Sequence, residues 1–173
     1  MIYVLTYPKF EIHTTQVLDQ FRAQNEPERA KLVAPHLTLM FGVKGVEPQE
    51  IVTLCRDVVE AMPQFQVTLD RFEMDYDSIE KTHKIYLLCG KGREQVIALH
   101  EALYQAKYRS QLRLGIPYQP HMTVATNKDQ SALKATKLSS LGELPIAGTI
   151  EKIDVVAVRS GKLRSLETVT LDG

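Results

Sequence analysis

Two copies of one short motif contain the residues of this chain best suited to chemistry. The sequence Pro-His-Leu-Thr-Leu begins at Pro35, and Pro-His-Met-Thr-Val begins at Pro120. If each copy forms a β-strand, its histidine and threonine share one face and its apolar residues occupy the other. Near neutral pH one imidazole can accept a proton from an attacking group while a second donates a proton to a leaving oxygen. The duplication therefore indicates acid–base chemistry at a phosphate, without a metal ion.

We expect His36 and His121 to be the catalytic pair, with Thr38 and Thr123 as donors to the phosphate oxygens. On a strand, each threonine lies about 6 to 7 Å from its histidine along the same face. Donors at that position stabilise the negative charge that builds in a pentacoordinate transition state. The sequence leaves open which histidine is the acid and which is the base. A single His-x-Thr in a strand is most often structural, but two copies with a shared proline and shared apolar spacing favour the functional interpretation.

The motif pair resembles that of the 2H phosphoesterases, a family named for two His-x-Thr/Ser-x motifs. The family includes the 2'-5' RNA ligases and the cyclic nucleotide phosphodiesterases, and the resemblance is concentrated in residues 35–43 and 117–125. It implies a two-lobed fold and hydrolysis of a 2',3'-cyclic phosphate on an RNA end or a small nucleotide, with ligation as the reverse reaction. Members commonly carry a Lys or Arg shortly after one motif, whereas Met40 and Ala125 occupy those positions here.

Composition restricts the partners and the compartment. The chain has 173 residues, with 21 basic and 21 acidic side chains, so it lacks the overall positive field that attracts a long polyanion. We therefore expect a small ligand or an RNA end, and no DNA. Cys55 and Cys89 lie in apolar surroundings without partners at metal spacing, which is typical of free thiols in a reducing cytoplasm. No apolar run approaches the roughly 20 residues that span a bilayer, and the N-terminus lacks a signal peptide, so we expect a cytoplasmic monomer that contacts no membrane and needs no cofactor.

Hydrophobic periodicity and Pro/Gly positions predict the elements that hold the motifs. The predicted strands are 2–7, one within 32–43, 65–74, 84–89, 121–126, 145–158 and 163–171. The predicted helices are 12–24, 48–62, 94–108 and 129–141, and 26–31 is a charged connection. This order predicts one α+β domain over residues 1–173. We expect two pseudo-symmetric lobes whose antiparallel sheets line a central cleft, with helices outside and the motif strands side by side.

A basic segment precedes and overlaps the second motif. Residues 102–128 contain no acidic side chain and four cations, Lys107, Arg109, Arg113 and Lys128. This local excess could attract a phosphorylated ligand, although Lys107 and Arg109 could equally complement the dipole at a helix end. Tyr118 could stack on a base, donate to a phosphate or simply pack. We assign Tyr118 and Arg113 to substrate binding.

Three histidines, His13, His83 and His100, match no motif, and we expect no catalytic role for them. Two other functions remain. A non-catalytic module could keep the cleft to bind a nucleotide or an RNA end, but the intact histidine and threonine in both motifs argue against it. Metal binding is weakly supported, because His-x-Thr offers one ligand per strand and no Asp, Glu or Cys joins it at ligand spacing. The physiological substrate, and whether the product carries a 2'- or a 3'-phosphate, stay open.

Overall fold

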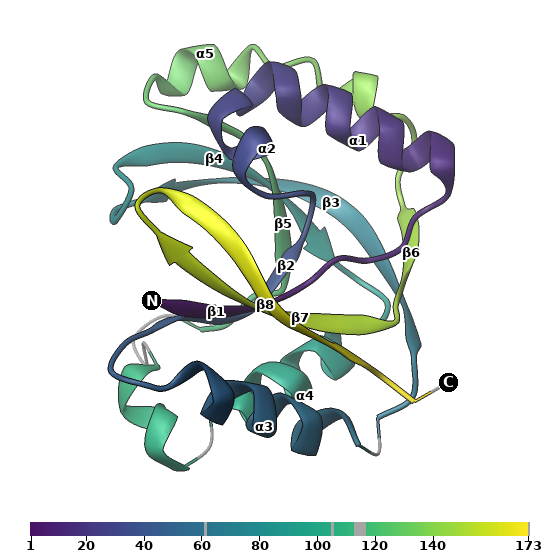
Figure 1. Cartoon of the computed structure of the whole chain (residues 1–173). Coiled ribbons are helices and arrows are strands. Elements are labelled where there is room, and N and C mark those ends of the chain that lie inside the picture. The colour runs from purple at the N-terminus through teal and green to yellow at the C-terminus, as the bar shows by residue number, and fades with distance from the viewer. Residues whose placement is uncertain (61, 105, 113–116, 173) are drawn as a thin grey trace.

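A computed structural model describes residues 1–60, 62–104, 106–112 and 117–172 of the chain. Two four-stranded antiparallel sheets form its centre, and helices cover them on opposite sides (Figure 1). The first sheet has the strand order β2 (Leu37–Val43), β1 (Ile2–Thr6), β7 (Lys152–Arg159) and β8 (Lys162–Thr170). The second has the order β5 (His121–Asn127), β4 (Thr82–Cys89), β3 (Phe65–Asp77) and β6 (Ile146–Ile150). The predicted α+β class with two antiparallel sheets is confirmed.

The two motif strands occupy equivalent places in the two sheets. Strand β2 is an edge of the first sheet and β5 is an edge of the second. These edges contact each other, and we call the line along which they meet the seam. The expectation that the motif strands lie side by side is therefore met, although each strand belongs to a different sheet.

Each sheet is packed by a helix whose flanking strands belong to the other sheet. The helices are α1 (Ile12–Asn25), α2 (Pro27–Leu32), α3 (Pro48–Val59), α4 (Arg93–Leu103) and α5 (Gln130–Lys134). Helix α1 connects β1 to β2 in the first sheet but packs against β5 of the second, whereas α4 connects β4 to β5 in the second sheet but packs against β2 of the first. Helices α1, α2 and α5 thus lie on one side of the molecule, and α3 and α4 lie on the other (Figure 1).

Local sequence explains the elements that border the seam. Along β5, Met122 and Val124 are fully buried while His121 and Thr123 are partly exposed, as the alternation predicts. Helix α3 begins at Pro48, whose fixed φ suits the first helical position. In the β7–β8 hairpin, Ser160 and Gly161 have φ values of 49° and 71°. Positive φ at both central residues is the geometry that two-residue hairpin turns require.

Two predicted segments differ from the structure. Residues 26–31 were expected to be a charged connection, but α2 forms there, because Pro27 starts the helix and Arg29 and Lys31 in its last turn complement the dipole. The single strand predicted over 145–158 is wrong. The chain leaves the second sheet after β6 and enters the first as β7, so the two parts bury their apolar side chains in different sheets.

The two sheets do not correspond to the two halves of the chain. Strands β7 and β8 come from the C-terminal end of the sequence but join β1 and β2. Helix α4 ends at Leu103, before a 3-10 turn over Ala106–Gln111, and the helix predicted over 129–141 divides into α5 and a 3-10 turn at Leu138–Leu141. A continuous core of buried apolar residues runs through both sheets and the helices outside them.

Candidate functional site

Both motif histidines are held by the same hydrogen bond. The Nδ1 atom of His36 lies 2.8 Å from the carbonyl oxygen of Ala34, and Nδ1 of His121 lies 2.7 Å from that of Gln119. A carbonyl only accepts, so each Nδ1 carries the proton and donates it, and in the neutral ring Nε2 keeps its lone pair. Each motif therefore presents Nε2 as the atom that can accept or deliver a proton.

The repeated proline has a structural explanation in this tether. Pro35 and Pro120 each stand between the histidine and the residue whose carbonyl accepts from it. The residue before a proline is restricted to extended backbone, which fixes the direction of its carbonyl. The duplicated Pro-His pair is therefore a device that sets the orientation of each imidazole.

Burial makes both imidazoles weak bases. It lowers the pKa of His36 to about 4, against an opposing effect of the bond to Ala34, and the charges of Arg29, Arg22 and His121 lower it further. Burial also lowers the pKa of His121, and Lys84 and Arg29 add to this, while the bond to Gln119 opposes it. Both rings are thus neutral near pH 7 in the ligand-free protein. The strands that carry the two rings contact each other at the seam.

The motif threonines lie on the same strand faces as the histidines. Thr38 and Thr123 are partly exposed, whereas the apolar residues on either side of each are fully buried. In the part of the chain that the structure describes, neither hydroxyl has a protein hydrogen-bond partner. Both hydroxyls can therefore donate to a ligand placed at the seam.

A tyrosine lies beside each motif histidine, and neither tyrosine belongs to a motif. Tyr7 follows β1, the neighbour of β2, and its ring centroid lies 6.1 Å from that of His36. Tyr86 belongs to β4, where it pairs with Thr123, and its ring centroid lies 4.1 Å from that of His121. Burial raises the pKa of each tyrosine to about 12, so both hydroxyls stay protonated and can donate. Only strand pairing places Tyr86 beside the motif.

Tyr118 connects the second motif to the first. Its hydroxyl donates to the carbonyl oxygen of Thr38 at 2.8 Å, and its ring stacks on His100 with centroids 3.6 Å apart. Buried His100 in turn has Nδ1 2.7 Å from the carbonyl oxygen of Leu39. These contacts make Tyr118 a packing and positioning residue across the seam. A direct contact between Tyr118 and a substrate stays a prediction.

In the described part of the chain, no hydrogen bond or ring contact joins the motif residues to Arg109, His13 or His83. Arg113 lies outside the described residues, so its role in substrate binding stays a prediction. Arg109 is exposed in the 3-10 turn after α4. His13 is exposed on α1, and His83 packs beside Tyr76 with ring centroids 4.9 Å apart.

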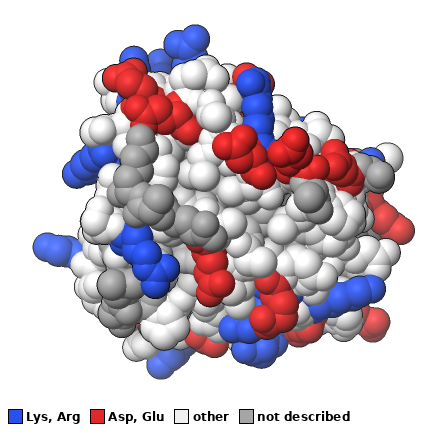
Figure 2. All heavy atoms as spheres, turned by 90° about the horizontal axis from the view of Figure 1, so that it is seen from below, with Lys and Arg blue, Asp and Glu red and all other residues white. Residues whose placement is uncertain are grey.

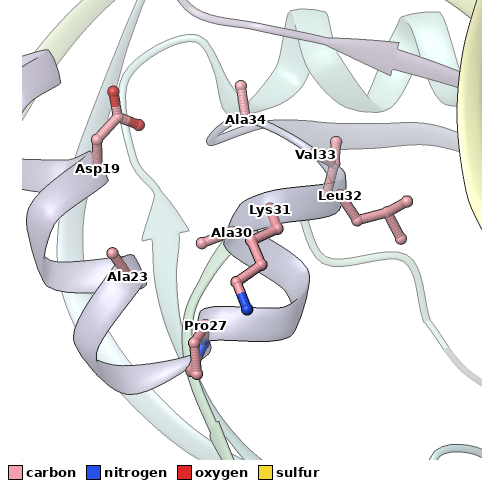
Figure 3. Close-up of a pocket in the computed structure, with 8 residues that line it drawn as sticks. All are labelled: Asp19, Ala23, Pro27, Ala30, Lys31, Leu32, Val33 and Ala34. Carbon is pink, nitrogen blue, oxygen red and sulfur yellow. The ribbon is translucent and has the colours of Figure 1, made fainter.

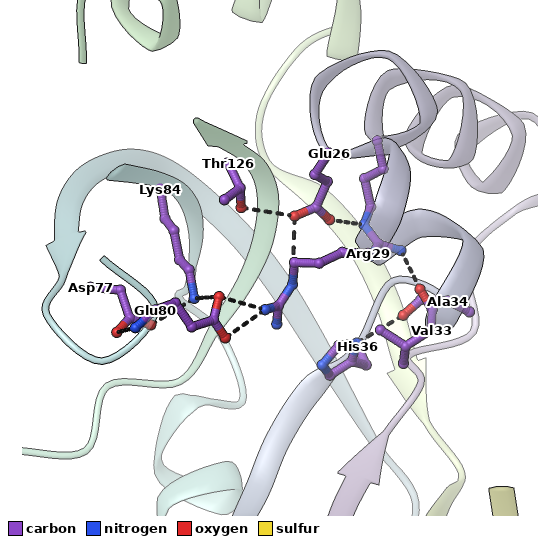
Figure 4. A network of polar contacts seen from close by, with 10 residues as sticks. Glu26, Arg29, Val33, Ala34, His36, Asp77, Glu80, Lys84 and Thr126 are labelled. Atoms are coloured by element: carbon purple, nitrogen blue, oxygen red, sulfur yellow. Dashed lines mark hydrogen bonds and ion pairs between the residues drawn. The ribbon is translucent and has the colours of Figure 1, made fainter. Parts of the chain in front are cut away.

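A network of charged side chains borders the seam (Figure 4), and no motif pointed to it. Arg22 and Glu26 form an ion pair with side chains only 2% and 1% exposed. Arg22 also donates to the carbonyl oxygen of Val33 at 2.9 Å, next to the residue that tethers His36. From Glu26 the network continues through Arg29 and Glu80 to Lys84. It joins α1 and α2 to the β3–β4 hairpin and lies next to His36 (Figure 4).

A shallow pocket of about 410 Å³ lies between α1 and α2 (Figure 3). Its lining is mostly apolar and includes Val33 and Ala34. Neither motif histidine lines it, so it is separate from the candidate site. Within the described ranges, no three His, Cys, Asp or Glu side chains gather as metal ligands. No helix among the described residues is long and apolar enough to cross a membrane.

A protein-family model and several solved structures match the chain. A family model described as the 2'-5' RNA ligase superfamily matches residues 8–162. Among curated protein sequences, none matches the chain. Solved structures with the same fold include E. coli LigT in its apo form, at 19% identity and a TM-score of 0.60 over 99% of this chain and 97% of that one.

Two further structures show the same fold. TT0787 of Thermus thermophilus has 18% identity and a TM-score of 0.66, with 99% and 98% of the two chains covered. Usb1 of Kluyveromyces marxianus has 11% identity and a TM-score of 0.55, with 99% and 97% covered. Because the family model spans both histidine motifs and most of the chain, the protein belongs to the 2'-5' RNA ligase superfamily of 2H phosphoesterases.

Proposed function

We propose that this protein is a metal-independent phosphoesterase that hydrolyses a 2',3'-cyclic phosphate on an RNA end or a small nucleotide. The observation that carries the proposal is the identical tethering of two imidazoles, which leaves one proton-transferring Nε2 on each side of the seam. Related LigT has been solved in complex with 3'-AMP, with ATP and with phosphate, which supports a phosphorylated ligand for the shared fold.

The reaction needs one neutral and one protonated imidazole. The neutral Nε2 accepts a proton from water as the water oxygen bonds to phosphorus. The bond from phosphorus to one ribose oxygen breaks, and the second imidazolium donates its Nε2 proton to that oxygen. A phosphate monoester and a free hydroxyl result, and the two imidazoles have exchanged protonation states. Either histidine can fill either role in this scheme.

Groups around the rings match the charge changes of this reaction. The anionic phosphate favours the protonated form of a nearby imidazole, which offsets the effect of burial on the pKa values of His36 and His121. The hydroxyls of Thr38 and Thr123 donate to the non-bridging oxygens, where negative charge increases in the transition state. These four residues form the proposed catalytic set.

The direct test is turnover of 2',3'-cyclic nucleotides and cyclic-phosphate-ended oligonucleotides in excess chelator by wild type, His36→Ala, His121→Ala and the double variant. Exposed His13→Ala is the matched control. Each motif substitution should lower kcat by about 10² to 10⁴, and the double variant should be far from additive because the pair acts as a unit. Phosphorus NMR of the product identifies a 2'- or a 3'-monoester. Near-normal turnover by His121→Ala would refute the mechanism, and binding without turnover by wild type would favour a non-catalytic module.

A further inference from the structure

The positive charge that a phosphate needs does not come from the motif strands. Members of the family commonly carry a cation shortly after one motif, and Met40 and Ala125 stand at those positions here. Both side chains are fully buried in the core, with 0% exposure. A register shift separates Met40 from Thr38 in the β1–β2 pairing and Ala125 from Thr123 in the β4–β5 pairing. Each bulge turns its residue away from the face of the motif threonine, so another element must neutralise the phosphate.

Among the described residues, the charged network beside His36 contains three cations, which differ in their availability to a ligand. Arg22 is buried, and it is bound to Glu26 and to the carbonyl of Val33. Lys84 is also buried, and its Nζ lies 2.7 Å from Asp77 and 2.8 Å from Glu80. Arg29 on α2 differs, because 30% of its side chain remains exposed.

Glu80 orients the guanidinium of Arg29, but not every nitrogen of the group has a hydrogen-bond partner among the described residues. Its Nη1 atom lies 2.9 and 3.0 Å from the two carboxylate oxygens of Glu80. Its Nε atom is buried without a hydrogen-bond partner in the described residues, and the nearest oxygen of Glu26 is 3.8 Å away. In Figure 4 the guanidinium lies between the Glu80–Lys84 pair and His36. Besides burial, the charge of Arg29 lowers the pKa of both His36 and His121.

We propose that Arg29 is the phosphate-binding cation of this enzyme and donates to the non-bridging oxygens of a phosphate held between His36 and His121. This assignment rests on the proposed function. A planar guanidinium suits the task, because it offers several donors in a fixed fork. Glu80 then acts as a positioning residue that holds the fork toward the seam. Helix α2 thus supplies the charge that the motif strands lack.

The test compares Arg29→Gln, Arg29→Lys and Glu80→Gln with the control Arg56→Gln. Arg56 is exposed on α3, where it pairs with Glu167 at 2.9 Å. Three quantities are measured for each variant: the Kd for inorganic phosphate, from imidazole NMR shifts, and kcat and KM on a 2',3'-cyclic nucleotide. Urea unfolding confirms that each variant is folded.

Arg29→Gln should weaken phosphate binding and lower kcat by about 10² to 10³, the loss typical of one transition-state donor. Arg29→Lys keeps the charge and should retain part of both, while Arg56→Gln should match wild type. Glu80→Gln breaks the same ion pair but keeps the cation, so its loss should stay within about tenfold, one unit of 1.4 kcal/mol. Equal losses in Glu80→Gln and Arg29→Gln would overturn the proposal, because the ion pair alone would then explain them.

The phosphate measurement also separates this inference from the proposed function. If wild type binds phosphate through Arg29 but turns over no cyclic phosphate, the catalytic proposal fails and the binding role stands. If turnover is normal and Arg29→Gln leaves both phosphate affinity and kcat unchanged, the role of Arg29 fails alone. If Arg29→Gln does not fold, Arg29→Lys is compared with Glu80→Gln instead. Arg29→Lys must then weaken phosphate binding and lower kcat more than Glu80→Gln does, because lysine lacks the fork geometry of the guanidinium.

Discussion

Replacing Glu26 by glutamine should cost a large share of the protein's stability. The Glu26 side chain is 1% exposed, and it pairs with Arg22, which is 2% exposed. Its second oxygen accepts from Thr126 on β5 at 3.2 Å and faces Arg29 at 3.8 Å. The amide keeps the shape of the carboxylate but removes its charge, so Arg22 is left as a buried cation without a counter-ion.

The expected size follows from the burial of both partners. Removing one member of a buried ion pair costs about 3 to 5 kcal/mol, whereas exposed pairs contribute about 0 to 1 kcal/mol. A domain has only about 5 to 15 kcal/mol of stability in total. With a urea dependence of about 2 kcal/mol per molar, the unfolding midpoint should fall by roughly 2 M.

The assay is equilibrium urea unfolding of Glu26→Gln beside Glu28→Gln. Glu28 is the matched control, because it pairs with Lys31 at 3.0 Å while its side chain is 87% exposed. Its midpoint should hardly move. A double variant, Arg22→Met with Glu26→Leu, removes both charges and should recover much of the loss. If Glu26→Gln unfolds at the same urea concentration as Glu28→Gln, the network does not stabilise the fold as argued.

Three further predictions concern the site. Because burial lowers the pKa values of both motif histidines, the free enzyme loses its protonated imidazole at lower pH than a free histidine would. The kcat/KM profile should be bell-shaped, with both apparent pKa values below about 6.5 and a fall of about tenfold per pH unit above them; a profile that rises into the alkaline range would point to another base. Tyr118→Phe removes the bond to Thr38 and should cost about 1 to 2 kcal/mol in urea unfolding and lower kcat with KM unchanged, whereas a rise in KM alone would assign Tyr118 to substrate binding. Charged side chains of both signs are interspersed on the face covered by α3 and α4 (Figure 2), and the net charge is zero. The affinity for a cyclic-phosphate-ended oligonucleotide should therefore depend only weakly on salt concentration, with the release of about one or two counterions on the single-strand scale. A steep salt dependence that Arg109→Glu abolishes would show instead that the protein binds along a polymer.

Features that depend on neighbours along the chain could be predicted from the amino-acid sequence alone. The repeated Pro-His-x-Thr pattern identified both motifs, and period-two alternation placed Leu37, Leu39, Met122 and Val124 in the core, where they are fully buried. The antiparallel two-sheet class followed from the same periodicity. These inferences hold because a strand's side-chain alternation and a proline's restriction of its predecessor are local properties.

Which distant residues meet at the seam depends on the three-dimensional fold and could not be predicted from local sequence. Tyr86 joins the second motif through its pairing with Thr123, and Tyr118 reaches the carbonyl of Thr38 between two different sheets. Arg29 stands on a helix that the sequence pattern did not predict, and its partner Glu80 follows far along the chain. The division of residues 145–158 between two sheets likewise could not be predicted from local sequence. Such contacts depend on strand order and register, which are set when the apolar faces of separate elements pack together and not by any pattern within one segment.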